Sequence, residues 1–441
     1  MEGRLLLYVL SFLSAMDTGM INVALPTIIT KIGGSTQYVW IADAFHVAAA
    51  VLRPFYSQLL QVFPKRHLLV GLITLFIVGS GMAGAASNAA QLIFGRTLQG
   101  LTIGAISESW VMTYGNRDIR QERKRHDHPA SSLSTIGIII SPIVGGALAG
   151  SSWRWIFYFH IPLSGLALFA LMILPFFHTT PNPNPNPNPN PNETSLTYPD
   201  YLGTLLLIAS TICLLLGVTR GGVDDQPWSS WKTIVPLVLG PVGWLVFLLQ
   251  QRLVSNPSIP LRLFANSSTG IVYLVTFLSS IVDQALLAFL PIYFQAVQGT
   301  TAIRSGVCLL PLILATVFIV MPAILCWLFF AYLDLLGAHR PIRAFSFALS
   351  ALAFGLFTLL NETSSTVKWV RDPEMRAHLA KGGAYAFASQ MHGIKESLNQ
   401  GVWEDIVGVY VKGLRMIWWV GLGISCFGCF AVWMERDGLR Q

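Results

Sequence analysis

Charged residues are scarce in this 441-residue chain. Asp, Glu, Lys and Arg make up 11% of it, while hydrophobic residues make up 53%. Soluble domains carry roughly 25% charged residues, so the composition excludes an ordinary soluble globular protein. The apolar runs also lack the period-two alternation of barrel strands, which excludes a membrane β-barrel. The composition therefore predicts an all-α polytopic membrane protein.

Catalytic chemistry is also missing. The sequence shows no nucleophile–base set, no cluster of metal ligands and no phosphate-binding loop, so we expect no enzyme, no metal and no cofactor. The five cysteines all lie in apolar runs. Cys426 and Cys429 are spaced as CxxC, but no further ligand lies nearby. We interpret them as small helix-packing residues rather than as a redox or zinc site.

Long apolar runs are abundant. A spanning helix needs roughly 20 mostly apolar residues, and the sequence predicts about twelve such segments. They are 5–26, 38–63, 67–86, 89–114, 131–150, 155–177, 201–218, 233–250, 269–294, 306–336, 342–360 and 413–434. Pro311 and Pro322 fall inside the longest segment, which we interpret as one kinked or tilted helix. We expect no cleavable signal peptide, so the first segment remains as a helix.

Lys and Arg in the short loops fall mainly on one side of the membrane, which predicts that both termini are cytosolic. We expect the plasma membrane, with the vacuolar membrane as the alternative. The formal net charge of +7 fits basic cytosolic loops facing anionic lipid head groups of the bilayer. The basic run 120–125 lies in one of these short loops, so we expect no nucleic acid partner.

A spacer divides the chain. Residues 181–192 are Pro-Asn repeats, which forbid helix and favour extended polyproline II. We expect an N-terminal six-helix bundle (1–177), a cytosolic linker (178–200), an inserted helix pair (201–250), the start of a C-terminal bundle (251–360), an extracellular loop (361–412), and a last helix with a cytosolic tail (413–441). Asn361 begins a sequon on the outer side and is the candidate for glycosylation.

Two charged residues lie deep inside apolar segments. A guanidinium at membrane depth, such as that of Arg96, must face protein or a water-filled cavity. Asp17 lies about 18 Å along its helix from Leu5, near the middle of the membrane. Burial favours the neutral form of this carboxyl group and a nearby cation favours its charged form, which suits reversible protonation. Asp17 is therefore either a proton-coupling group or a static partner of Arg96.

Other charged residues are more ambiguous. Asp43 and Arg53 lie roughly 15 Å apart along one helix, so they do not pair directly. Glu108 and Asp283 each line a cavity or face water near a membrane surface, and the sequence favours neither position.

Small residues recur at helix-packing spacings. Gly100 and Gly104 form GxxxG, which lets helix backbones approach closely. The next segment combines Gly137, Ser141 and Pro142 with the pair Gly145 and Gly146. This combination is typical of a bendable helix packed tightly against a partner, and tight static packing requires the same residues.

These residues, in this order, resemble the fungal fourteen-span drug:proton antiporter branch of the major facilitator superfamily. The similarity rests on Asp17 with INVALP (21–26), on RTLQGLTIG (96–104) with Arg96, Gln99, Gly100 and Gly104, on GIIISPIVGG (137–146), on WRWIFYFHIP (153–162) and on LPIYFQAVQG (290–299). Ser141 stands where the branch has glycine, and His160 where it has asparagine.

The resemblance implies two bundles around a central cavity and alternating access driven by the proton gradient. It implies proton coupling for Arg96 and Asp17, and a role in antiport for the glycines and proline of 137–146.

The chain departs from the branch in three further places, one of which is the basic loop at 120–125, which only loosely resembles the ERGK pattern of the branch. The loop signature at 57–66 keeps its basic pair, Lys65 and Arg66, but not its glycine and acidic positions. Residues 368–370 run directly into a segment that resembles the outer loop before the last helix of the branch. Two late helices are therefore absent by this comparison, which predicts an incomplete C-terminal bundle.

Three functions follow. The first is a monomeric, proton-coupled exporter of small amphipathic or apolar molecules, such as toxins, drugs or secondary metabolites. The second is uptake of a nutrient or siderophore, which the fold alone does not exclude. The third is a degenerate or truncated form that does not transport, which the absent helix pair favours.

Overall fold

The computed structural model describes residues 2–34, 37–63, 65–115, 120–173, 199–221, 228–254, 257–259, 267–314, 347–348, 350–352, 354–355, 387–388, 390–391 and 400–433. Within these residues there is no strand. Eight helices are long and apolar enough to span a membrane, and Tyr38–Val51 and Ala302–Leu314 are shorter apolar helices. Most of the expected span 342–360, the second half of 306–336, most of the linker 178–200, and Asn361 lie outside the described residues.

The chain packs into two compact units. The first contains residues 1–18, 32–140 and 152–261, and the second contains 19–31, 141–151 and 262–441. The long helices α1 (Glu2–Ile32) and α6 (Arg120–Ser151) each contribute residues to both units. The helix pair expected as an insertion belongs to the first unit.

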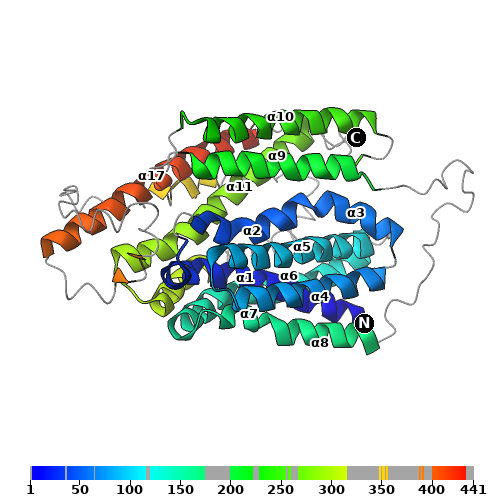
Figure 1. The fold of residues 1–441 in the computed structure, drawn as a ribbon, viewed down its shortest axis with the longest axis horizontal. Coiled ribbons are helices and arrows are strands. Elements are labelled where there is room, and N and C mark those ends of the chain that lie inside the picture. Colours follow the sequence, from blue (N-terminus) through cyan, green and yellow to red (C-terminus); the bar gives the residue numbers. More distant parts are fainter. Residues whose placement is uncertain are drawn as a thin grey trace, which may run out of the picture. The chain divides into compact units, whose positions relative to one another are not determined.

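The first unit is built around α5. Besides parts of α1 and α6, this unit contains α2 (Tyr38–Val51), α3 (Arg53–Val62), α4 (Lys65–Gly84), α5 (Ala89–Gly115), α7 (Trp155–Tyr158), α8 (His160–Ile173), α9 (Tyr201–Arg220) and α10 (Trp231–Leu253). Helix α5 packs against α2, α3 and α4, and α4 also packs against α8 (Figure 1). Their shared core contains buried Leu13, Phe45, Phe76 and Ile103.

Two expected spans are each broken into two helices. The segment 38–63 forms α2 and α3, with the break at Leu52. Pro54 causes it, because proline lacks an N–H and suits the first turn of a helix but not its interior. Residues 155–173 of the segment 155–177 form α7 and α8, which meet at Phe159, and Pro162 lies in the first turn of α8.

Helices α9 and α10 form a close antiparallel pair (Figure 1). Gly217 lies against the backbone of Leu237, and Gly240 lies against Leu214 in the same way, so each helix offers a glycine to its partner.

The buried carboxylate of Asp200 connects α9 and α10 at one end of this helix pair. Asp200 accepts the backbone N–H of Gly203 at 2.8 Å, which caps α9. The side-chain amides of Gln250 and Gln251 donate to it at 2.9 Å and 2.6 Å. Its own backbone N–H donates to Gln58 of α3 at 2.8 Å. Asp200 therefore joins α3, α9 and α10.

The second unit contains α11 (Ser267–Ile292), the π-helical turn η3 (Tyr293–Val297) and α17 (Gln400–Trp433), and α17 packs against both α11 and η3. The last helix begins at Gln400 rather than at residue 413, so it includes the final part of the expected loop 361–412. Ile406 and Tyr410 are buried against η3 at helical spacing. The charges at Glu404 and Asp405 concealed this amphipathic pattern in the sequence.

Candidate functional site

The buried charge centre forms on α1 and α5. Asn88 caps the start of α5 by accepting the N–H of Gln91 at 2.8 Å. Two turns into the helix Arg96 is fully buried, and so is Asp17 of α1. Arg96 donates from Nη1 to Asp17 Oδ2 at 2.5 Å. The two charges that the sequence identified separately therefore form one ion pair.

Neutral side chains extend this pair. Arg96 Nη1 also lies 3.4 Å from Gln99 Oε1, and Gln99 Nε2 donates to the hydroxyl of Ser80 at 2.8 Å. The guanidinium lies over the ring of Phe45, 4.7 Å from its centroid, and 6.0 Å from the centroid of Phe157. Aromatic faces attract cations, so Arg96 keeps favourable contacts that do not depend on Asp17.

The centre has unused hydrogen-bonding capacity. Among the described residues, Asp17 Oδ1, Arg96 Nε and Arg96 Nη2 have no hydrogen-bond partner. Buried polar atoms are satisfied in the great majority of cases, because each orphan costs about 1–3 kcal/mol. An ion pair with this much spare capacity can accept a proton or a new partner, which a saturated structural pair cannot.

The glycines of α5 hold it against α2. A methyl group at Gly100 would overlap the backbone carbonyl of Phe45, and one at Gly104 would meet the backbone of Ala49. The GxxxG spacing therefore brings α5 close enough for the Phe45 ring to cover Arg96.

The small residues of α6 are also backbone contacts. Gly137 lies against Phe12 of α1. In the second unit, Gly145 lies against the backbone of Met20, and Gly146 against the backbone of Ala302. The carbonyl of Pro142 occupies the space beside Gly306. Each small residue thus has a packing role, and bending of this helix stays a prediction.

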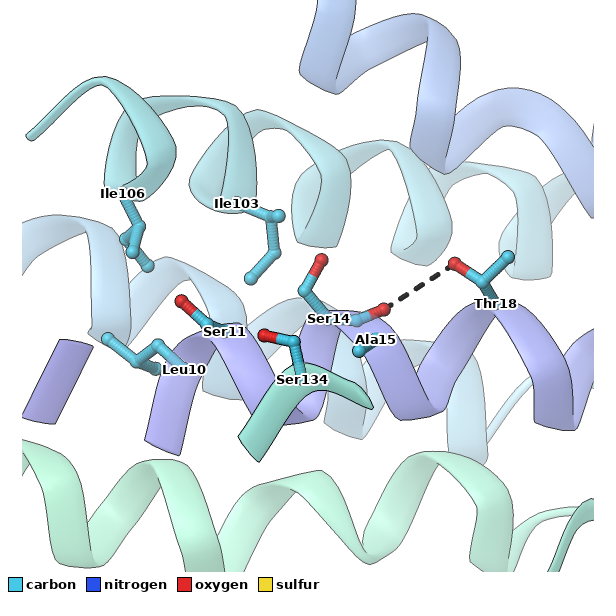
Figure 2. Close-up of a pocket in the computed structure, with 8 residues that line it drawn as sticks. All are labelled: Leu10, Ser11, Ser14, Ala15, Thr18, Ile103, Ile106 and Ser134. Carbon is cyan, nitrogen blue, oxygen red and sulfur yellow. Dashed lines mark hydrogen bonds between the residues drawn. The ribbon is translucent and has the colours of Figure 1, made fainter. Parts of the chain in front are cut away.

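A cavity lies between α1, α5 and α6 (Figure 2). Its volume is about 300 Å³. Hydroxyl groups of Ser11, Ser14, Thr18 and Ser134 share its wall with the aliphatic side chains of Leu10, Ile103 and Ile106. None of the lining residues is charged. Asp17 and Thr18 are consecutive in α1, so the helix that carries the ion pair also forms one cavity wall.

The remaining predicted residues lie elsewhere. Arg66 donates to the carbonyl of Met172 at 2.9 Å, which ties the start of α4 to the end of α8. Lys65 begins α4 and Glu108 lies in α5, but their side chains lie outside the described part. Asp43 and Asp283 are exposed in α2 and α11.

Sequence reasoning missed His160, Ser80 and Phe45 as members of the centre. His160 is fully buried, with Nε2 3.9 Å from Asp17 Oδ1. The replacement of asparagine by histidine in the 153–162 motif was a usable signal. Ser80 and Phe45 carry none, because a serine or phenylalanine in an apolar helix is ordinary until its neighbours are known.

A bundle of apolar helices with a buried ion pair is typical of helical membrane transporters. Residues 7–391 match the Major Facilitator Superfamily. The MFS-type efflux pump LUC4 of Fusarium sp is 32% identical over 430 residues, which cover 95% of this chain and 72% of that protein. The chain belongs to the Major Facilitator Superfamily, as the motifs predicted.

Further relatives are also fungal. The Acurin A biosynthesis cluster MFS-type transporter of Aspergillus aculeatus is 34% identical over 81% of this chain and 63% of its own length. Efflux pump FUS6 of Gibberella fujikuroi is 29% identical over 96% of this chain and 87% of its own length. That alignment spans 497 positions, more than the 441 residues here, so the relative contains residues without a counterpart in this chain.

Solved structures confirm the all-α transporter fold. The bacterial homolog of the human lysosomal transporter Spinster, in an inward-facing and unoccupied conformation, aligns with 98% of this chain and 96% of its own, with a TM-score of 0.54 and 14% identity. The peptide transporter POT in complex with sulfate aligns with 98% and 95%, with a TM-score of 0.52 and 13% identity.

Proposed function

We propose that this chain is a proton-coupled exporter of small, uncharged amphipathic molecules. The observation that carries the proposal is the buried, under-satisfied ion pair of Asp17 and Arg96. A proton on Asp17 removes the negative partner of Arg96, while Gln99 and the Phe45 ring still hold the guanidinium. The pair thus has two states that differ by one proton, and Gln99 and the Phe45 ring offset part of the cost of the protonated state.

The cavity supports the substrate class. Aliphatic walls bind apolar surface, and hydroxyl groups can both donate to and accept from oxygen-rich groups of a ligand. The absence of charged residues among those that line it argues against a strongly ionic substrate. The names of the fungal relatives, efflux pumps and a transporter of a biosynthetic cluster, favour export of toxins or secondary metabolites over uptake.

We place the exporter in the plasma membrane as a monomer, with both termini in the cytosol and the proton gradient as its energy source. The alternative, a form that does not transport, is favoured by the residues that efflux pump FUS6 has and this chain lacks. The predicted absence of two late helices would account for those residues.

Export from yeast cells tests the proposal. Cells that express the chain are loaded with tritiated cycloheximide, a small uncharged molecule with hydroxyl and carbonyl groups, and efflux is measured with and without a protonophore. We expect efflux that the protonophore abolishes and that Arg96→Ala and Asp17→Asn lose at normal surface expression. Efflux that survives the protonophore would overturn proton coupling, and no efflux from wild-type cells would favour the non-transporting form.

A variant of the cavity sharpens the test. Ser14→Phe fills the space between α1 and α5 and is expected to raise KM or abolish efflux. Ser151→Phe is the matched control, because Ser151 is an exposed serine at the end of α6 and does not line the cavity.

A further inference from the structure

His160 is an ionisable residue in the charge centre that the coupling scheme above does not use. It begins α8 and is fully buried. Its ring meets Phe76 edge-on, with centroids 5.8 Å apart, and Phe159 at 6.3 Å. These two rings fix its position without satisfying its nitrogens.

The free atoms of His160 and Asp17 are complementary. Nε2 of His160 lies 3.9 Å from Oδ1 of Asp17, and neither atom has a hydrogen-bond partner in the described part of the chain. A hydrogen bond between them needs about 2.7–3.2 Å. A shift of roughly 1 Å would therefore join two orphaned atoms, while Oδ2 of Asp17 keeps its bond to Arg96.

His160 has few ionisable neighbours in the described part of the chain. Arg96 of α5, Asp17 of α1 and the backbone of Ile156 and Phe157 act on it directly. His46 and Asp43 of α2 lie within electrostatic range of Arg96. Helices α4 and α7 pack against α8. The basic residues of α4 lie at its start, where Arg66 bonds Met172 near the far end of α8. The only ionisable residue of α7 is Tyr158, whose ring lies over Gly84.

We propose that His160 binds the coupled proton and shares it with Asp17, which rests on the proton coupling proposed above. With Asp17 ionised and His160 neutral, the centre of Asp17, Arg96 and His160 has a net charge of zero. One proton from water adds to the free imidazole nitrogen and raises that charge to one. The imidazolium donates to Asp17 Oδ1, so the carboxylate lies between two cations, and the proton later returns to water on the other side.

This arrangement avoids one cost of the simple scheme, although the centre gains one positive charge in both. Protonation of Asp17 itself would leave Arg96 as a buried charge without an anion, which costs several kcal/mol. Protonation of His160 leaves the bond between Arg96 and Asp17 intact. The extra positive charge is still unfavourable in a dry site, and it favours a conformation in which water reaches the centre.

Histidine protonation can be measured directly and without transport. The full chain is labelled with ¹⁵N-histidine, placed in phosphatidylcholine liposomes and studied by solid-state NMR between pH 5 and 9. The His160 signal is identified by its loss in His160→Asn, and exposed His67 serves as the internal reference. Burial opposes the charged form, so we expect the imidazolium signal of His160 at the acidic end of this range, and we expect Asp17→Asn to reduce it. A His160 signal that stays neutral throughout, or one that Asp17→Asn leaves unchanged, would overturn the proposal.

A transport measurement separates a proton site from a packing role. The pH profile of cycloheximide efflux is compared for wild type and His160→Asn, which keeps a polar side chain but cannot carry a proton. We expect efflux to fall at least about tenfold and to lose its pH dependence. A wild-type profile in His160→Asn would contradict the proposal. Absence of efflux in wild type would instead refute the proposed function, and the NMR titration would still decide the role of His160.

Discussion

Arg96 Nη1 and Asp17 Oδ2 lie 2.5 Å apart, although 79 positions separate the two residues in the chain. Both are fully buried, and each keeps polar atoms that bond to nothing in the described part of the protein. The pair thus combines strong mutual attraction with incomplete satisfaction. A pair that only supports the fold and a pair that couples protons to transport predict different results when the charges of Asp17 and Arg96 are removed.

Removing one charge should destabilise the protein more than removing both. Asp17→Asn leaves the buried Arg96 cation without an anion, and Arg96→Gln leaves the buried Asp17 carboxylate without a cation. We expect each variant to lower the free energy of unfolding by about 3–5 kcal/mol. The double variant removes both charges and should recover most of that loss, while efflux stays absent. Thermal unfolding in detergent measures the first effect, and recovery of efflux in the double variant would show that the pair is only structural.

The close approach of α5 to α2 depends on Gly100. A methyl group there would overlap the carbonyl of Phe45, which is backbone and cannot move alone. We expect Gly100→Ala to cost about 1–3 kcal/mol and to weaken efflux, because the Phe45 ring is displaced from Arg96. Gly71→Ala in α4 is the control, since nothing lies within 4 Å of that position. Equal melting temperatures for the two variants would refute the close packing.

The glycines of α6 offer a test on a single helix. Gly146→Ala would press against the backbone of Ala302, whereas Gly150→Ala meets only the tip of Ile303 at 4.0 Å. We expect the first variant to lose efflux and the second to retain it, with both still inserted in the membrane. Efflux measured on cells of matched surface expression distinguishes them, and equal rates would argue against this contact.

The Asp200 cluster should stabilise the α9–α10 pair. Asp200→Ala removes the cap of α9, worth about 0.5–2 kcal/mol. It also removes the carboxylate that accepts from the amides of Gln250 and Gln251, although the Gln251 amide keeps its bond to Gln250 Oε1. We expect a lower melting temperature and faster proteolysis near α9. Ser258→Ala is the control, because its hydroxyl lies a long 3.4 Å from Asp200. If Ser258→Ala destabilises as much as Asp200→Ala, the carboxylate is not the centre of this cluster.

Composition and residue spacing were enough to predict the protein class and part of the charge centre. The length of the apolar segments predicted a membrane protein, and the segment RTLQGLTIG placed Arg96, Gln99, Gly100 and Gly104 on one helix. The cost of buried charge made Asp17 and Arg96 partners in one of the two interpretations. These inferences need only local sequence and the properties of the bilayer.

Other features depended on contacts between distant segments. The environment of His160 is formed by the ring of Phe76 and the carboxylate of Asp17, which lie on other helices and are distant in the sequence. The start of α17 at Gln400 was hidden by the charges of Glu404 and Asp405, although the side chain of Asp405 is itself buried. Two local signals were available but not used: Pro54, which breaks the second span, and Asp200, which stands three residues before Gly203 at a helix start.

Direct measurement of proton movement tests the central claim. Purified protein in liposomes that contain the trapped pH indicator pyranine receives cycloheximide at equal pH on both sides, and the internal pH is followed. We predict a proton flux that requires cycloheximide and that is absent in Arg96→Ala. Cycloheximide transport without any proton flux would contradict the assignment of Asp17 and Arg96 to coupling.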